Sequence, residues 1–268
     1  DTKISQKELI GTLNTVIFCP EDLQLIKGTP SGRRRFLDME ISQTSATYYH
    51  QLMQYNRLLQ QRNAVLKEYR GKNTIPLEEW DLQLADMASF IVKKRLESLK
   101  KINLLIDLMN RKLTGGLENL TIGYEQPYMD NGSLEYTKEG FYERIKAALP
   151  QDRHRLSTSV GPHRDDLRFF SDAMDLKKFG SQGQQRTAVL SLKLSELEFI
   201  KSEVGEYPVL LLDDVLSELD ESRRANLLQF IHKRIQTFIT TTDIHDFKDL
   251  KSVQFISCEG GQVQYGQP

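Results

Sequence analysis

The chain has 268 residues, 39% hydrophobic and 27% charged, which is the composition of a globular protein rather than of a disordered or fibrous one. Its 36 lysines and arginines balance 37 acidic residues, so the formal charge of -1 excludes a protein that coats nucleic acid by bulk charge; any such site must be a local patch. No apolar run approaches the roughly 20 residues of a membrane span, no export leader opens the chain, and Cys19 and Cys258 lack disulfide or metal-ligand spacing, so we expect a cytoplasmic protein without a membrane partner.

The N-terminal part of the chain predicts a strand over 13–19 and then a helical hairpin. The strand is short, apolar and β-branched, and it ends at Pro20. Apolar and aromatic residues then recur at alternating steps of four and three from Tyr48 to Tyr69, with Arg62 in the one polar position. Gly, Asn and Pro interrupt this spacing over 71–76, and it resumes from Trp80, which we place in the core, to Met109. The spacing predicts an antiparallel arm about 30 Å long, at about 1.5 Å per residue.

The C-terminal half predicts a return to a sheet-containing lobe. Two glycines end the second arm helix at 115–116, and alternation over 120–124 predicts a strand. After a short helix over 138–149, strands at 166–170, 209–212 and 237–241 alternate with helices at 182–203 and 221–233, which predicts a parallel α/β sheet. We therefore divide the chain into a head lobe over 1–40, a helical arm over 41–116 and a second head lobe over 117–268.

Two acidic residues follow the apolar strand at 209–212, at the edge where open α/β sheets bind ligands. Asp213 is a candidate magnesium ligand, directly or through water, and Asp214 is a candidate to orient or deprotonate an attacking water. The pair by itself also fits a strand that ends in polar residues. Asp220 fits an ordinary helix N-cap without further function.

The start of the helix at 182–203 is a second candidate site. Ser181 and Gln184 have the spacing of a capping box, which would explain them structurally. Gly183, however, costs stability in the first helical turn and leaves backbone N–H groups open to an anion. This combination favours a phosphate site.

These motifs carry a family resemblance. The segments 181–185, 209–214 and 217–220 resemble, in the expected order, the signature motif, Walker B motif and D-loop of the ABC-type ATPase superfamily. Within it, the segments 20–23, 27–30, 33–38 and 160–166 resemble the RecF family of bacterial recombination mediators, and the hairpin sits where that family carries its arm. The resemblance covers essentially the whole chain and implies an α/β ABC-type ATPase head with an inserted antiparallel helical arm.

The resemblance also implies roles for individual residues in an ATP-dependent homodimer. The signature residues would contact the γ-phosphate of ATP held mainly by the other subunit, and Asp220 would contribute at the dimer seam. Asp213 would serve Mg²⁺, and Asp214 would stand in for a catalytic glutamate. At the switch position Thr242 is the candidate for γ-phosphate sensing, with His245 as the second choice. The candidate nucleotide contacts are therefore Ser181, Gln182, Gly183, Gln184, Asp220 and, in place of a Q-loop glutamine, Glu21 or Asp22.

The sequence contains no Gly-x-x-x-x-Gly-Lys-Ser/Thr segment, which is the loop that cradles phosphates in this superfamily. In the family that loop lies N-terminal to where this chain begins, so we expect the P-loop part of the head to be missing here. This chain alone would then bind ATP and Mg²⁺ poorly or not at all.

The function that the resemblance implies is an ATP-gated clamp on duplex DNA near junctions with single strands. It would act in repair of gapped DNA with the RecR and RecO mediators and lead indirectly to RecA loading. The candidate DNA contacts, each cluster of which also fits solvated surface, are Arg33, Arg34, Arg35, Lys93, Lys94 and Arg95.

The sequence leaves three other functions to consider. The first is an SMC-like scaffold that organises DNA without required ATP turnover. The second is a transporter ATPase subunit, against which the long hairpin speaks. The third is a nuclease that uses the segment 163–166 with the acidic pair 213–214, whose spacing matches no helical metal motif.

Overall fold

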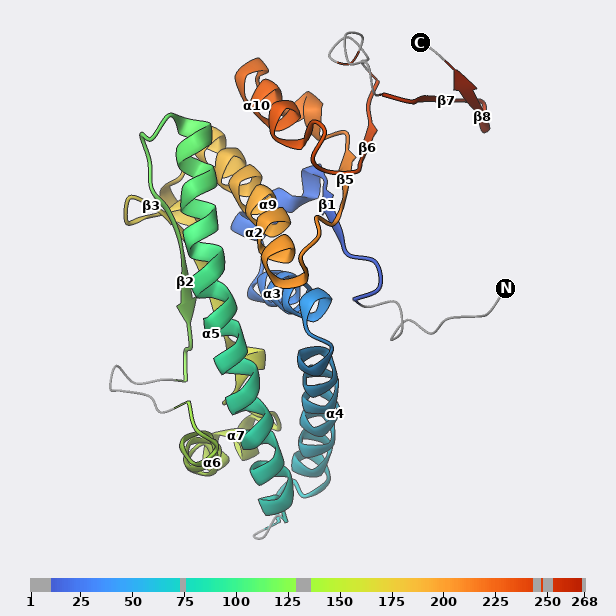
Figure 1. The fold of residues 1–268 in the computed structure, drawn as a ribbon. Helices are drawn as coiled ribbons and strands as arrows, with labels where there is room; N and C mark the ends of the chain where they lie inside the picture. Colours follow the sequence, from blue (N-terminus) through green and yellow to red (C-terminus); the bar gives the residue numbers. More distant parts are fainter. Residues whose placement is uncertain (1–10, 73–75, 129–135, 243–246, 248–252, 267–268) are drawn as a thin grey trace.

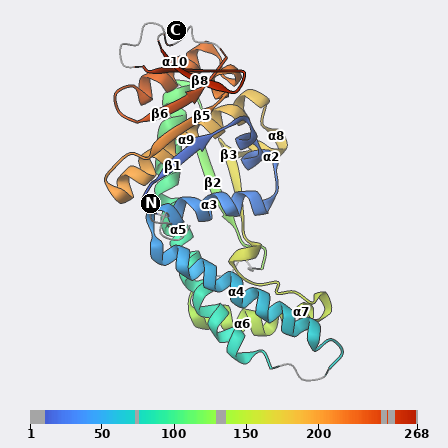
Figure 2. The same cartoon turned by 90° about the vertical axis from the view of Figure 1, so that its right-hand side faces the viewer.

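The computed structural model describes residues 11–72, 76–128, 136–242, 247 and 253–266. The chain is elongated, with a head that carries the sheets at one end and a helical arm at the other (Figures 1 and 2). Within the described ranges, no helix is both long enough and apolar enough to cross a membrane.

The parallel sheet of the head has the strand order β1 (Thr15–Phe18), β5 (Val209–Asp213) and β6 (Thr237–Thr240). The register pairs Phe18 with Leu212 and Asp213 with Thr240, so the carboxyl ends of the three strands meet at one edge. Val16, Phe18, Leu210 and Leu212 are buried, and β1 packs on the long helix α9 (Gln182–Val204). The prediction of parallel strands is confirmed for this part of the chain.

The opposite face of this sheet is apolar but open. The register places Ile17, Leu211 and Phe238 in one row across the three strands. Ile17 is 51% exposed and Phe238 is 53% exposed. Few of the described residues therefore pack against this apolar row.

A second sheet is antiparallel, with the order β2 (Leu120–Glu125), β3 (Asp166–Ser171) and β4 (Met174–Asp175). The prediction that the strand at 166–170 belongs to the parallel sheet is wrong. This strand pairs with β2 over its full length and turns directly into β4, at Asp172 and Ala173, both of which have positive φ. Alternation of elements along the sequence does not determine which strands pair.

The arm is built on α4 (Ala46–Glu68) and α5 (Glu78–Thr114). Tyr48, Tyr55 and Leu66 are buried in the seam, as the spacing predicts, and Trp80 is half-buried. With 37 residues, α5 is about 55 Å long at about 1.5 Å per residue, more than the predicted arm, because its C-terminal part runs into the head and packs on β2 and α9. Gly115, with φ 68°, ends it in the left-handed conformation.

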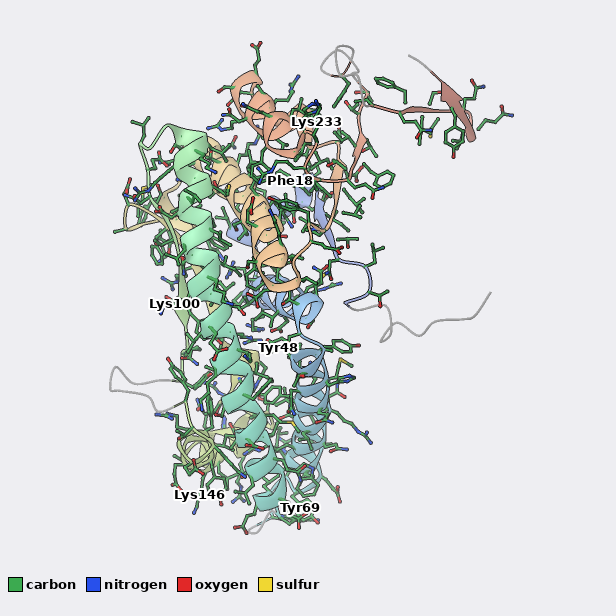
Figure 3. All side chains as sticks on the ribbon, viewed as in Figure 1. Phe18, Tyr48, Tyr69, Lys100, Lys146 and Lys233 are labelled. Atoms are coloured by element: carbon green, nitrogen blue, oxygen red, sulfur yellow. The ribbon has the colours of Figure 1, made fainter. Side chains whose placement is uncertain are left out.

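The arm also includes a segment that the sequence assigns to the head. The helices α6 (Lys138–Ala147) and α7 (Leu149–Arg155) follow β2, and α6 packs on α5. In Figure 3, Lys146 and Tyr69 both lie toward the far end of the arm, whereas Phe18 and Lys233 lie in the head. The structure therefore places 138–155 beside the arm helices rather than within the head.

The remaining elements connect these layers. The 3-10 turn η1 (Pro20–Leu23) and the short helix α2 (Gln24–Lys27) follow β1, η2 (Pro162–Arg164) precedes β3, and α8 (Leu176–Phe179) precedes α9. After β5 come the 3-10 turn η3 (Val215–Glu218) and α10 (Glu221–Ile231). The sequence did not predict α3 (Pro30–Thr44) or the hairpin of β7 (Phe255–Glu259) and β8 (Gln262–Gly266).

Candidate nucleotide and DNA site

Four predicted site residues lie at the carboxyl edge of the parallel sheet. Asp213 ends β5, Asp214 follows it, Glu21 lies in η1 just after β1, and Thr242 lies two residues beyond β6. All four are exposed. The strand order therefore gathers at one edge residues that are more than 200 positions apart in the chain.

Thr240 holds the acidic pair. Its Oγ1 donates a hydrogen bond to Oδ1 of Asp213 at 2.7 Å, and the same oxygen accepts the backbone N–H of Asp214 at 3.1 Å. Asp214 has φ 50°, a left-handed conformation that costs free energy for a residue with a Cβ and turns the chain out of the strand. The sequence gives no signal for this role of Thr240, because the register of β5 against β6 is needed to see it; Thr242 stays the candidate for γ-phosphate sensing.

The signature segment opens α9 as a capping box, as predicted. Ser181 Oγ accepts the backbone N–H of Gln184 at 3.2 Å, and Gln184 Oε1 accepts the backbone N–H of Ser181 at 3.0 Å. Ser181 and Gln182 are exposed, and a Cβ added at Gly183 would meet only Ser181 Oγ, at 4.0 Å. The first turn of α9 is therefore open to close approach of an anion, and its Ser181 O–H remains able to donate.

The neighbouring motif segments meet around a small cavity of about 40 Å³. Its walls come from the end of β1 with η1, the second turn of α9, and the segment after β5: Phe18, Cys19, Pro20, Leu23, Arg186, Val189, Val215 and Leu219. Among the described residues, no hydrogen bond or ion pair joins the signature segment directly to Asp213 or Asp214.

A buried charge cluster connects η1 to α9. Lys193 of α9 pairs with Asp22 at 3.2 Å and with Glu196 at 3.4 Å. Burial raises the pKa of Glu40, on α3, to about 7, although the nearby Lys193 opposes this shift. The sequence missed this cluster; its only signal is a lysine three residues after Leu190, on the apolar side of the helix.

Asp220 caps α10, as its position predicts. Its Oδ1 accepts the backbone N–H of Arg223 at 2.9 Å, and its carboxylate pairs with the Arg223 side chain. Asp220 is exposed, so a dimer role would be compatible with the cap. His245 lies outside the described residues.

Two of the predicted DNA contacts do not fit the structure. Arg33 is 3% exposed, and its guanidinium binds both carboxylate oxygens of Asp166, at 2.7 and 2.8 Å. Arg95 is 2% exposed and pairs with Asp38 and Asp165. Their charges are neutralised inside the protein, so neither can reach a phosphate.

The other four cationic candidates remain accessible to different degrees. Arg35 and Lys93 are exposed, whereas Arg34 is half-buried and donates to the backbone oxygen of Asp165 at 2.7 Å. Lys94 pairs with Glu97 at 2.8 Å on the surface of α5. These side chains stay candidates for DNA contact.

The segment 163–166, considered above for a nuclease, serves the arm–head junction. Asp165 is fully buried and accepts from Tyr128 at 2.6 Å besides pairing with Arg95 at 3.2 Å. His163 Nε2 lies 3.0 Å from the carbonyl oxygen of Thr158 and so donates to it, which leaves Nδ1 to accept from the Tyr55 hydroxyl at 2.6 Å. Burial lowers the pKa of His163 to about 4. These groups are used in packing, and the part of the chain that the structure describes holds no cluster of three or more metal-ligating side chains.

Comparison with known proteins identifies the family. The chain is 50% identical over 250 residues to the DNA replication and repair protein RecF of Alkaliphilus oremlandii, covering 92% of this chain and 68% of the relative. It is 47% identical over 251 residues to the protein of the same name from Halothermothrix orenii, covering 91% of this chain and 67% of the relative. A scan against protein-family models gives no match.

Solved structures agree. The recombination mediator protein RecF in the RecFOR pathway, solved as RecF-ATPrS and as RecF-ATP, aligns with a TM-score of 0.87 and 37% sequence identity in both cases. The alignments cover 97% of this chain and 70% and 69% of those chains. The expected α/β head of ABC-ATPase type is thereby confirmed. At this identity and coverage, over about two thirds of the length of its relatives, the chain belongs to the RecF family of DNA replication and repair proteins.

Proposed function

We propose that this chain forms the arm and part of the head of an ATP-gated DNA clamp that acts in recombinational repair of gapped DNA. One observation carries the proposal: at the carboxyl edge of the parallel sheet, Thr240 holds Asp213 beside Asp214. In the same chain, the signature segment opens a helix whose first turn is exposed. One chain would thus supply residues to both faces of a nucleotide sandwich between two subunits, without the phosphate-cradling loop.

The residues present fit MgATP in part. Asp213 offers an exposed carboxylate with Oδ2 free of the bond from Thr240, which suits a hard cation that retains water ligands. The open first turn of α9 suits phosphate oxygens. When bound, MgATP would supply the bond that is hydrolysed; Asp214 would position the water, and Ser181, Gln182, Gly183 and Gln184 would reach the γ-phosphate held by a second subunit. Relatives solved as RecF-ATP and RecF-ATPrS support ATP as the nucleotide.

The phosphate-cradling loop would come from a segment outside this chain. A P-loop strand and helix would need an apolar surface to pack on, and the row Ile17, Leu211 and Phe238 provides one on the open face of the parallel sheet. Burying such side chains contributes roughly 25 cal/mol per Å² of apolar surface. The proposal therefore assigns that face to the rest of the head.

The substrate would be duplex DNA near junctions with single strands, bound by an ATP-dependent homodimer. Because the contacts would be to backbone phosphates, affinity should fall by roughly 0.9 log units per log unit of salt for each phosphate neutralised. The solved relatives belong to the RecFOR pathway, which supports RecR and RecO as partners. RecA would be the recombinase served indirectly, as the family resemblance implies.

The Asp214→Asn substitution tests this function. In the chain carrying its natural upstream sequence, an amide at this position cannot deprotonate water, so the ATP-closed clamp should stay on circular duplex DNA after dilution into ATP-free buffer. The matched control is Asp86→Asn, which changes an exposed carboxylate on the arm helix α5 and should release DNA as the unmodified protein does. Equal retention by all three proteins would instead identify a scaffold that does not depend on ATP turnover.

A further inference from the structure

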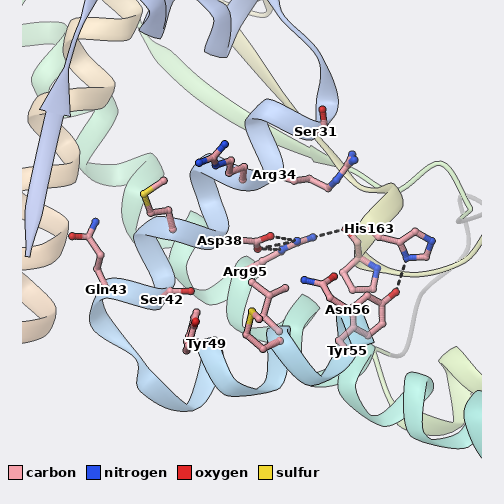
Figure 4. Close-up of a pocket in the computed structure, with 15 residues that line it drawn as sticks. Ser31, Arg34, Asp38, Ser42, Gln43, Tyr49, Tyr55, Asn56, Arg95 and His163 are labelled. Carbon is pink, nitrogen blue, oxygen red and sulfur yellow. Dashed lines mark hydrogen bonds and ion pairs between the residues drawn. The ribbon is translucent and has the colours of Figure 1, made fainter. Parts of the chain in front are cut away.

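A cavity of about 520 Å³ lies where the arm leaves the head, apart from the nucleotide motifs (Figure 4). It is bounded by α3, by the first turns of α4, and by η2. This is within the size range of pockets that bind small ligands or single anchoring side chains. None of its lining residues belongs to the nucleotide motifs, although Arg34 and Arg35 are also candidate DNA contacts.

One wall of the cavity is apolar and exposed. Met39 of α3 is 50% exposed and Met53 of α4 is 47% exposed, and Tyr49 and Leu52 line the same cavity. Methionine side chains are flexible and polarisable, so they adapt to different apolar partners. Grouped exposed apolar side chains of this kind mark binding surfaces.

The floor of the cavity is a hydrogen-bonded cluster around Asp38. Arg95 donates to both oxygens of Asp38, at 3.0 Å each, and the hydroxyl of Tyr48 donates to the same carboxylate at 2.5 Å. Beside it, the bond between Tyr55 and His163 holds η2 against α4 (Figure 4). Asp38, Asp165 and Asp166 also act electrostatically on Arg34, so they offset part of its charge. Three arginines, Arg34, Arg35 and Arg95, line the cavity against the one carboxylate of Asp38, so the lining keeps a positive balance.

Two arginines of α3 leave the cavity positively charged. Arg35 is exposed and Arg34 uses its Nη1 for the backbone oxygen of Asp165. Neither forms an ion pair with any residue that the structure describes, in contrast to Arg33 on the same helix. An incoming carboxylate would therefore find two cations with donors still available.

We infer that this cavity binds an acidic peptide segment of another protein. An aromatic or aliphatic side chain of the segment would enter between Met39, Leu52 and Met53, and neighbouring Asp or Glu side chains would pair with Arg34 and Arg35. The apolar wall favours a peptide over nucleic acid, whose charged backbone gains nothing from methionine and leucine side chains. This site goes beyond the proposed clamp function and would act without ATP.

The inference is tested by panning a phage library of random short peptides on the whole chain. The clones recovered should be enriched in Asp or Glu next to Phe, Leu or Ile, and a fluorescent synthetic copy of the most abundant clone should bind with an affinity measurable by anisotropy. The double variant Arg35→Ser, Met53→Ser should weaken that affinity by about tenfold or more. Because both side chains are exposed, circular dichroism should show an unchanged thermal transition.

The matched control is the double variant Lys100→Ser, Leu104→Ser, which also removes one exposed cation and one apolar side chain that is 71% exposed, but on α5. It should bind the peptide as the unmodified chain does. The inference is overturned if recovered clones bind the cavity variant as tightly as the unmodified chain, if they are not acidic, or if only a fluorescent DNA duplex loses affinity in the cavity variant. The singly substituted chains Arg35→Ser and Met53→Gln provide the same readout should the double variant be unstable.

Discussion

At the scale of single residues, Arg62 shows how a polar side chain is accommodated in an apolar helical seam. It is fully buried, and its guanidinium binds Asp81 and Asp152, each at 2.6 Å, and Thr158 at 2.9 Å. The sequence marks Arg62 as the one polar position of the seam. Its partners could not be predicted, because they lie 19, 90 and 96 residues further along the chain and only the fold brings them together.

Replacing Arg62 by Met should destabilise the protein strongly. The substitution leaves two buried carboxylates without a cation, which costs about 3–5 kcal/mol in the free energy of unfolding measured by urea denaturation. The control is Lys94→Met, whose ion pair with Glu97 is on the surface and should contribute about 0.5 kcal/mol or less. A loss of under about 1 kcal/mol in Arg62→Met would mean that the carboxylates are not held as the structure shows.

His163 should make stability depend on pH. Burial lowers its pKa to about 4 in the folded chain, whereas the unfolded value is 6.5, so between these limits the unfolded chain binds more protons. The free energy of unfolding should therefore fall by about 3 kcal/mol as pH is lowered from 6.5 to 4. Urea titrations of the unmodified chain and of His163→Gln at several pH values measure the free energy of unfolding of each. The difference between the two pH profiles is the contribution of His163.

The comparison with His163→Gln is needed because Glu40 changes the free energy of unfolding with pH in the opposite direction. Burial raises its pKa to about 7, so its contribution is present at low pH and is lost as pH rises through 7. His154→Gln, at an exposed position of α7, is the matched control and should keep the pH dependence of the unmodified chain. If His163→Gln also keeps it, His163 is not held neutral in the folded state.

At the scale of elements, the sequence predicts the existence of most helices and strands and their ends to within a few residues. The predicted strand at 120–124 and helix at 182–203 correspond to β2 at Leu120–Glu125 and α9 at Gln182–Val204. The helix α3 was missed because its buried residues include Arg33 and Glu40, which break the apolar period. Strand pairing was partly wrong, because local pattern does not tell a parallel partner from an antiparallel one.

The end of β6 gives a prediction at this scale. Thr240→Val keeps the shape of the side chain but removes the hydroxyl that binds Asp213 and the backbone N–H of Asp214, so it should lower the free energy of unfolding by about 1 kcal/mol. In the chain with its upstream sequence it should also slow ATP hydrolysis, because Asp213 loses its orientation. Thr242→Val, at an exposed position beyond the strand, is the comparison. A smaller effect of Thr240→Val than of Thr242→Val on hydrolysis would mean that orientation of Asp213 by Thr240 matters less than the γ-phosphate contact proposed for Thr242.

At the scale of the whole molecule, arm and head are one structure rather than two linked bodies. The helix α5 runs from the arm into the head, and Arg95 on it binds Asp38 of α3, Asp165 and the backbone oxygen of Pro162. A short run of cationic residues on a helix is usually interpreted as solvent-exposed surface. For this reason Lys93, Lys94 and Arg95 are all candidate DNA contacts in the sequence. Only the fold reveals that the third of these is a buried link between the two parts.

The most direct test of the account is calorimetric titration of Mg-ATP into this chain and into the same chain carrying its natural upstream sequence. We expect no measurable binding by the chain as it stands, because it contains no Gly-x-x-x-x-Gly-Lys-Ser/Thr segment, and tight binding with dimerisation by the extended chain. Binding of Mg-ATP by the chain alone would contradict the assignment of the phosphate site to another segment. Failure of both chains to bind would contradict the nucleotide sandwich itself and leave a scaffold as the better account.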